Sequence, residues 1–464
     1  MTTTSAPPGP PGQPGPPGTP VPPEPPSRRP VIPAAAAGAE PDGGSTADGG
    51  VHPWAPSNTP GWYRLTTALT IALIVAFAAV ATVTAFVVRG SSATIENNTA
   101  PSLVAVQDLL AGVAEANASA TAVFLSGATG TEDRGRRNLY LDALERSARQ
   151  TEEVAGDVGD DDVSHAALKD VTAALATYSG EIEASRLANQ LDQDGADESL
   201  LRALDLTQTT IAPAVATVTE RSQEQFDRES STGRVLGIVA IALGVLALLQ
   251  LIRLQLGTVK RSNRVLNVGY LAATVALLVA VVLLGQQLLV RSSALSNAET
   301  GGYDSIASTS RLQADAFDVQ SELSLRLLGT PSASGTDIDE LMNQIEGDIA
   351  AVQSAADSDR ERAAASELSG RWARYRATTT DIAALVNADR DEAIDRFQGS
   401  GISTFNGLNT SIESVLSDNR SQFVDGVRGA ADSVTWLPIV ALALPLVAVL
   451  AIVWGTQRRL EEYQ

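Results

Sequence analysis

The stretch RLQLGTVKRSNR, from Arg253 to Arg264, lies between two long apolar runs and decides how the chain is organised. It contains Arg253, Lys260, Arg261 and Arg264 and no acidic residue. Short loops beside membrane spans that carry such an excess of basic residues stay in the cytoplasm. The stretch therefore predicts a basic cytoplasmic loop at residues 253–264, which joins two similar halves of a membrane protein and is the candidate output surface.

Four apolar runs predict four transmembrane helices. Each has about twenty residues without a charged side chain, enough for a helix to cross about 30 Å of hydrocarbon. The runs lie at residues 62–88, 235–252, 265–290 and 436–454. Pro445, inside the fourth run, removes one backbone hydrogen bond and is a candidate hinge. With four spans around a cytoplasmic loop, both termini, including the tail at residues 455–464, are predicted in the cytoplasm and the protein in the plasma membrane.

Two long acidic segments separate the spans. Residues 90–233 contain 25 acids and 10 bases, and residues 292–433 contain 23 acids and 11 bases. Strong acidity argues against binding to nucleic acid. Each segment has three short polar breaks, which predict four helices, and the topology above places both segments outside the cytoplasm.

The residues before the first span differ in composition. Residues 1–60 hold 18 of the 23 prolines and almost no large apolar side chain. Such a segment buries too little surface to offset the entropy of ordering it. A disordered, proline-rich cytoplasmic tail is predicted there.

The two acidic segments are copies of one unit. A shift of 197 residues places Leu175 on Trp372 and Tyr178 on Tyr375, in a seam of period 3.5. Long helices with such a seam and short connections form up-down-up-down four-helix bundles. The predicted fold is an all-α membrane protein with four transmembrane helices, two tandem extracytoplasmic four-helix bundles and a disordered tail. One unbroken helix from Val215 to Leu254 is expected to join the first bundle to the second span.

No catalytic pattern is found in the sequence. There is no cysteine, no phosphate-binding glycine loop and no pair of histidines at ligand spacing. The acidic cluster at residues 157–162 lacks the spacing and the closing glutamate of a calcium loop. No enzymatic activity, metal or cofactor is therefore expected.

Three arginines form the most conspicuous feature of the second acidic segment. Arg371, Arg374 and Arg376 surround Trp372 and Tyr375 in the predicted third helix. Guanidinium groups bind carboxylates, so these arginines are candidates for binding a ligand or a partner. The alternative is that Trp372 and Tyr375 belong to the core and the arginines pair with acids of neighbouring helices.

Two outward bundles held between paired spans look like the sensor halves of chemoreceptors and sensor kinases, but without a cytoplasmic output domain. With repeated Val-Arg junctions at residues 88–89 and 290–291 and Gln-Phe pairs at 225–226 and 422–423, the chain resembles the GlnX-type family of actinobacterial membrane signal transducers. The resemblance implies a solute-binding lipoprotein as the outside partner, a serine/threonine kinase as the cytoplasmic partner and amino-acid availability as the cue. A homo-oligomer is also considered. The alternative function is a non-signalling envelope scaffold that binds other surface proteins.

Overall fold

The computed structural model describes residues 59–128, 133–191, 193–262, 267–332, 337–356 and 359–460, which belong to one compact unit. Within these residues every regular element is a helix and no strand is present, as the apolar periodicity predicts. The predicted tail at residues 1–60 lies outside the described part, except for Thr59 and Pro60, which begin the first helix.

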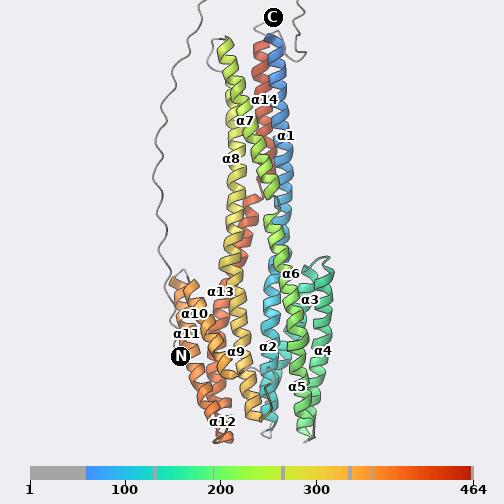
Figure 1. Ribbon diagram of the computed structural model, residues 1–464, viewed down its shortest axis with the longest axis vertical. Helices are drawn as coiled ribbons and strands as arrows, with labels where there is room; N and C mark the ends of the chain where they lie inside the picture. The colour runs from blue at the N-terminus through green and yellow to red at the C-terminus, as the bar shows by residue number, and fades with distance from the viewer. Residues whose placement is uncertain are drawn as a thin grey trace, which may run out of the picture. The chain divides into compact units, whose positions relative to one another are not determined.

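Among the described residues, four helices are long and apolar enough to cross a membrane, which fits a multi-pass membrane protein. The spans lie in α1 (Thr59–Thr94), α7 (Arg234–Ser262), α8 (Val268–Asn297) and α14 (Leu437–Leu460). They form a closed ring, in which α1 packs on α7 and α14, and α8 packs on the same two helices (Figure 1). Fully buried alanines lie inside this ring: Ala81, Ala240, Ala273 and Ala448. Small residues let span backbones approach closely, which is how helices associate in lipid.

In each copy the first helix runs from the span into the bundle without a break. In the first copy α1 continues through a π-turn, η1 (Ile95–Thr99), into α2 (Ala100–Ala128). In the second copy α8 continues through η3 (Ala298–Tyr303) into α9 (Asp304–Leu328). A π-turn widens the helix locally without ending it. Span and bundle are thus mechanically joined through the first helix of both copies.

The fourth helix of the first copy ends at the border with the second span. It consists of α5 (Ala196–Leu206), η2 (Thr207–Ile211) and α6 (Ala212–Ser231). Thr232 and Gly233 then form a turn before α7. Gly233 has a φ of +83°, a conformation that favours glycine, and a side chain at this position would collide with Val88. The prediction of one unbroken helix from Val215 to Leu254 is therefore wrong.

The fourth helix of the second copy is built in the same way, from two α-helical stretches joined by a π-turn. It consists of α12 (Arg390–Arg396), η4 (Phe397–Gly401) and α13 (Ile402–Val434). A turn at Thr435 and Trp436 separates it from α14. In both copies, therefore, only the first helix is continuous with its span.

Most of the predicted loop at residues 253–264 is helical in the structure, so the connector between the second and third spans begins later than predicted. Helix α7 continues to Ser262, so Arg253 lies within it and is exposed, and Lys260 and Arg261 belong to its last turn. Arg264 lies outside the described residues. Basic residues in the last turn of a helix interact favourably with its negative end, which favours extension of the helix through this stretch.

Two further helices complete each bundle. In the first copy α3 (Arg134–Asp157) and α4 (Asp162–Gln190) begin at Asp133 and Asp161, whose carboxylates accept hydrogen bonds from backbone N–H groups of the first turn. In the second copy the equivalent helices are α10 (Ile338–Ala355) and α11 (Asp359–Leu385). In both bundles the first helix packs on the second and fourth, and the third packs on the same two.

The core of each bundle contains the residues that the 3.5-residue repeat of the third helix predicted to be buried. Tyr178 is buried against Tyr140, with ring centroids 6.3 Å apart. Its counterpart Tyr375 is buried against Phe405, at 5.5 Å. Aromatic pairs at such separations contribute beyond the area they bury. The period of 3.5 thus predicted the packed face of the third helix correctly in both copies.

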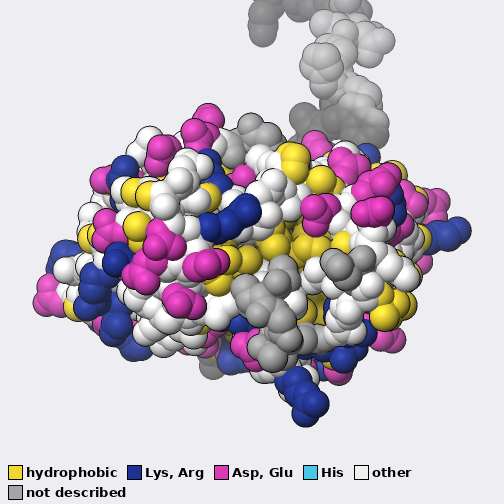
Figure 2. Space-filling model, turned by 90° about the horizontal axis from the view of Figure 1, so that it is seen from below, with side chains coloured by type: hydrophobic (Ala, Val, Ile, Leu, Met, Phe, Trp, Pro, Cys, Tyr) yellow, Lys and Arg dark blue, Asp and Glu magenta, His cyan; other side chains and the backbone are white. Residues whose placement is uncertain are grey.

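The two bundles meet along their first helices, because α2 packs against α9 (Figure 1). Helix α2 has only two charged residues, Asp108 and Glu115, and it is buried on most of its faces. A helix that is apolar nearly all round is buried on several sides. Seen from the end away from the spans, apolar side chains gather in the middle and acids and arginines mix around them (Figure 2).

Candidate functional site

The three candidate arginines of α11 point to different neighbours. Arg371 pairs with Glu367 of the same helix at 3.2 Å and its guanidinium lies beside Gly407 of α13. Arg376 pairs with Glu346 of α10 and donates a 2.9 Å hydrogen bond to Asn343. Arg374 is exposed, and among the described residues it has no ion pair. The structure thus places the three side chains apart rather than around one carboxylate.

A groove between α10 and α11 nevertheless includes one of them. It has a volume of about 550 Å³ and is lined by Arg376, Trp372, Glu346 and Asp381. Trp372 is 4% exposed, and its indole N–H has no hydrogen-bond partner among the described residues. A binding role for Arg371, Arg374 and Arg376 stays a prediction. Pro445 lies inside α14, which continues on both sides of it, and its role as a hinge also stays a prediction.

The sequence patterns did not indicate the seam between the copies, where α2 packs against α9 and polar side chains form further contacts. Thr121 of α2 donates a 3.4 Å hydrogen bond to the hydroxyl of Ser321 on α9. The phenol oxygen of Tyr303 accepts two hydrogen bonds of 3.2 Å, from Gln107 of α2 and from Gln223 of α6. Because each of these hydrogen bonds joins the two copies, any shift between the bundles must change them.

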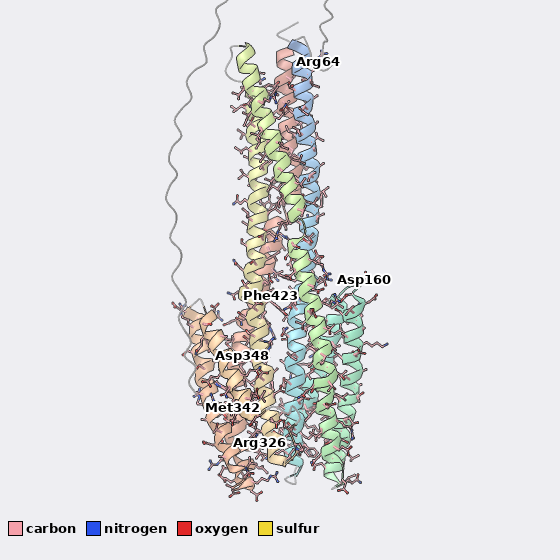
Figure 3. All side chains as sticks on the ribbon, viewed as in Figure 1. Arg64, Asp160, Arg326, Met342, Asp348 and Phe423 are labelled. Carbon is pink, nitrogen blue, oxygen red and sulfur yellow. The ribbon has the colours of Figure 1, made fainter. Side chains whose placement is uncertain are left out.

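Aromatic rings pack at the end of the seam that lies towards the spans. Phe226 of α6 and Phe423 of α13 occupy equivalent positions, 197 residues apart, and their ring centroids are 6.3 Å apart. The Tyr303 ring is 6.0 Å from Phe423, where the bundles join the spans (Figure 3). Contact between equivalent residues means that the two copies are related by an approximate twofold axis.

Arg291 ties the two copies together at the border between bundle and span. It lies on α8, is 3% exposed, and donates to the hydroxyls of Ser91 and Ser92 at 2.9 and 2.8 Å. It also donates to the backbone carbonyls of Glu229 and Ser230, both at 3.0 Å. These carbonyls belong to the last turn of α6, whose negative end favours a cation. One guanidinium thus holds the first and fourth helices of the first copy.

The repeated Val-Arg junction pointed to this region but in the wrong register. Arg89, its apparent counterpart, is exposed, whereas Val88 is fully buried. Counting from the π-turns, which begin at Ile95 and Ala298, Arg291 occupies the position of Val88. Sequence similarity at the junction therefore concealed a difference, because the second copy has a buried arginine where the first has valine.

Helix α9 carries a stripe of acids at Asp315, Asp318 and Glu322. Burial, followed by the neighbouring carboxylates of Asp315 and Glu322, raises the pKa of Asp318 to about 7. Burial and Asp348 raise the pKa of Asp315 to about 6, although Arg311 opposes this shift. Like charges on one helix face disfavour ionisation. The carboxyls of Asp315 and Asp318 therefore keep their protons to a higher pH than ordinary aspartates do.

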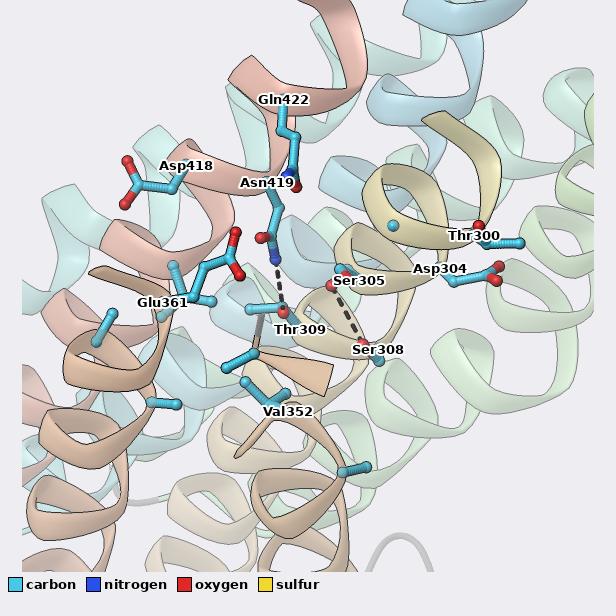
Figure 4. Close-up of a pocket in the computed structure, with 16 residues that line it drawn as sticks. Thr300, Asp304, Ser305, Ser308, Thr309, Val352, Glu361, Asp418, Asn419 and Gln422 are labelled. Atoms are coloured by element: carbon cyan, nitrogen blue, oxygen red, sulfur yellow. Dashed lines mark hydrogen bonds between the residues drawn. The ribbon is translucent and has the colours of Figure 1, made fainter. Parts of the chain in front are cut away.

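A cavity of about 400 Å³ lies in the second bundle, at the end towards the spans (Figure 4). Asn419 donates a hydrogen bond to Thr309 inside it, and Glu361 points towards them from α11. Asp304 lies on its wall but points away from Glu361 (Figure 4). Ligand sites in helical bundles are built from facing helices in this manner. Within the described ranges, no group of three or more histidines and carboxylates is placed to hold a metal ion.

Comparison with known proteins places the first bundle in a family context. Residues 91–231 match the model of the actinobacterial sensor domain, from just after the first span to the last residue of α6. No curated protein matches the chain. The finer resemblance to the GlnX type stays a prediction. The first bundle is similar to the actinobacterial sensor domain, and this similarity supports an actinobacterial sensor protein.

Proposed function

We propose that the protein is a membrane signal transducer whose two bundles face outside the cytoplasm and whose termini and α7–α8 connector lie in the cytoplasm. A shift between the bundles passes through the continuous first helices to a separate cytoplasmic effector. The observation that carries this proposal is the seam, because α1–η1–α2 and α8–η3–α9 each join a span to a bundle and pack against each other.

The strength of the seam suits such a role. Packing of α2 against α9 holds the copies together, and the polar contacts between them adjust this packing in small steps, because a hydrogen bond typically contributes about 0.5–1.5 kcal/mol to stability. Coupling energies between sites in allosteric proteins are about 1–3 kcal/mol. A ligand or partner whose affinity differs by this amount between two arrangements of the bundles shifts one bundle against the other without unfolding either.

The partners follow from the family resemblance. A solute-binding lipoprotein delivers the cue outside, and a serine/threonine kinase receives the signal in the cytoplasm. The proposal assigns no reaction to the chain itself. Purification of the full-length protein from membranes, with identification of the proteins that accompany it, tests both partners.

Reporter fusions test the orientation. A reporter that is active only in the cytoplasm should give a signal when fused after Gly257 and none when fused after Gly159. A reporter active only outside should give the reverse. A cytoplasmic signal after Gly159 would contradict the proposed topology.

Flexible insertions test the signalling route. A short Gly-Ser insertion between Thr94 and Ile95 breaks the continuous first helix, whereas the same insertion between Thr232 and Gly233 falls in an existing turn. In a deletion strain carrying either variant, phosphorylation of cytoplasmic proteins is compared before and after amino-acid addition. The first insertion should abolish the response and the second should preserve it. A normal response with both insertions would favour the envelope scaffold instead.

A further inference from the structure

The approximate twofold axis of the seam allows its two sides to be compared residue by residue. Glu96 and Glu299 are each the second residue of their π-turn, η1 in the first copy and η3 in the second. Both side chains are half-buried. On the facing helices α6 and α13, equivalent positions are 197 residues apart, as Phe226 and Phe423 show.

On the side of Glu96, arginines of α13 neutralise the carboxylates of the first copy. Arg428 lies 3.7 Å from the carboxylate of Glu96. Arg420, two turns earlier, pairs with Asp108 of α2. This side of the seam is closed by ion pairs between the copies.

On the side of Glu299, these arginines are missing. At the positions equivalent to Arg420 and Arg428, α6 has Gln223 and Ser231. Glu299 forms no ion pair within the described part of the chain. Instead, burial raises the pKa of Glu299, and Asp227 and Asp304 raise it further. The negative charge that an arginine balances on one side is thus unbalanced on the other.

A cavity of about 210 Å³ lies beside Glu299, and its lining includes Gln223, the residue equivalent to Arg420. Its walls carry the three carboxylates of Asp227, Glu299 and Asp304. Three aromatic residues, Phe226, Tyr303 and Phe423, also line it. Aromatic faces attract cations, and carboxylates form charge-assisted hydrogen bonds with ammonium and guanidinium groups.

Two arginines near this cavity in sequence do not neutralise its carboxylates. Arg228 follows Asp227 on α6, and Arg311 lies two turns after Asp304 on α9. Both side chains are exposed, neither lines the cavity, and neither pairs with its carboxylates among the described residues.

We propose that this cavity, between Glu299, Asp227, Asp304 and the three rings, binds the guanidinium or ammonium group of a small cationic molecule. The bound group takes the place that the Arg428 side chain has on the other side of the seam. Because its walls come from α2 and α6 of the first copy and from η3, α9 and α13 of the second, the ligand joins the copies. The inference rests on the proposed sensor function only for the consequence of binding, not for binding itself.

Calorimetry on the purified full-length protein in lipid nanodiscs tests the inference. The probes are L-arginine and L-lysine, with L-citrulline as the neutral analogue of arginine and calcium as a metal control. At least one of the two cationic amino acids should bind and citrulline should not. Glu299→Gln should weaken binding at least tenfold. Glu96→Gln is the matched control, and it should leave binding unchanged because Glu96 lies on the closed side.

A second variant supplies the arginine that this side of the seam lacks. Ser231→Arg places an arginine at the position equivalent to Arg428, so it should abolish binding while keeping or raising the melting temperature. The inference would be overturned if citrulline bound as well as arginine, if only calcium bound, or if no probe bound. It would also be overturned if Glu96→Gln weakened binding as much as Glu299→Gln. Failure of the insertions to uncouple signalling would overturn the sensor function but leave the measured binding intact.

Discussion

Nη1 of Arg291 donates a 3.0 Å hydrogen bond to the backbone carbonyl of Ser230, so that the first helix of the second copy holds the end of α6 in the first. Arg291→Ala removes this bond and three others, and it leaves two buried hydroxyls and two carbonyls without their donor. We expect a loss of about 2–4 kcal/mol in the free energy of unfolding, measured by chemical denaturation in detergent.

Arg89→Ala is the control for this variant, because Arg89 is exposed and occupies the sequence-equivalent junction. Its effect should stay within about 0.5 kcal/mol, as for most surface substitutions. A similar loss in both variants would contradict the assignment of the contact to Arg291 alone.

Thr121 and Ser321 should form a disulfide when both are replaced by cysteine. Their side-chain oxygens are 3.4 Å apart across the seam, and the natural chain has no cysteine to compete. With a protease site added between Asn263 and Leu266, cleavage should yield two fragments that separate on a gel only after reduction. Cysteines at the exposed Thr177 and Thr380, on the third helices of the two bundles, should give fragments that separate without reduction.

The sequence predicted what depends on one-dimensional patterns. Apolar runs predicted the four spans, and the seam of period 3.5 predicted the buried positions of Tyr178 and Tyr375. These features follow from burial of one face of a helix or of all of its faces. The scarcity of charge in α2 was a further signal, because a bundle helix with one buried face carries more than two charges over 29 residues.

The contacts between the two copies depend on residues that differ between them. An alignment of the copies by their similar residues does not show these differences. Arg291 matches Arg89 in sequence but stands where Val88 stands in the structure, because the helix registers differ by one residue. In the sequence, the turn at Gly233 is indicated only by one glycine after a polar run. The prediction of an unbroken helix extended the period of the fourth helix through this glycine. Neither feature has a periodic signal of its own.

Asp318→Asn should stabilise the protein more at high pH than at low pH. The unfolded carboxyl ionises near 3.8, whereas in the folded state burial, Asp315 and Glu322 raise its pKa to about 7. Between these values the folded state holds the extra proton, so stability falls as pH rises, and the loss is complete above pH 7. The neutral asparagine avoids this loss. We expect a gain of about 1–3 kcal/mol at pH 8 and little change at pH 4, from denaturation at both pH values.

Asp395→Asn provides the comparison, because Asp395 is exposed on α12. It should change stability by less than about 0.5 kcal/mol at either pH. If Asp318→Asn gave the same gain at pH 4 as at pH 8, its effect would come from packing rather than from charge.

Gly302 and Gly301 are adjacent in η3 but have opposite surroundings, which makes them a matched pair. A Cβ atom added to Gly302 would lie 2.9 Å from the Cα and Cβ atoms of Phe423, whereas one added to Gly301 meets nothing within 4 Å. Because the backbone of α13 must move to admit it, Gly302→Ala should destabilise the protein by about 1–3 kcal/mol. Gly301→Ala should instead stabilise the helix, by up to about 1 kcal/mol. Thermal unfolding measures both effects. Equal melting temperatures for the two variants would contradict the close contact between Gly302 of η3 and Phe423 of α13.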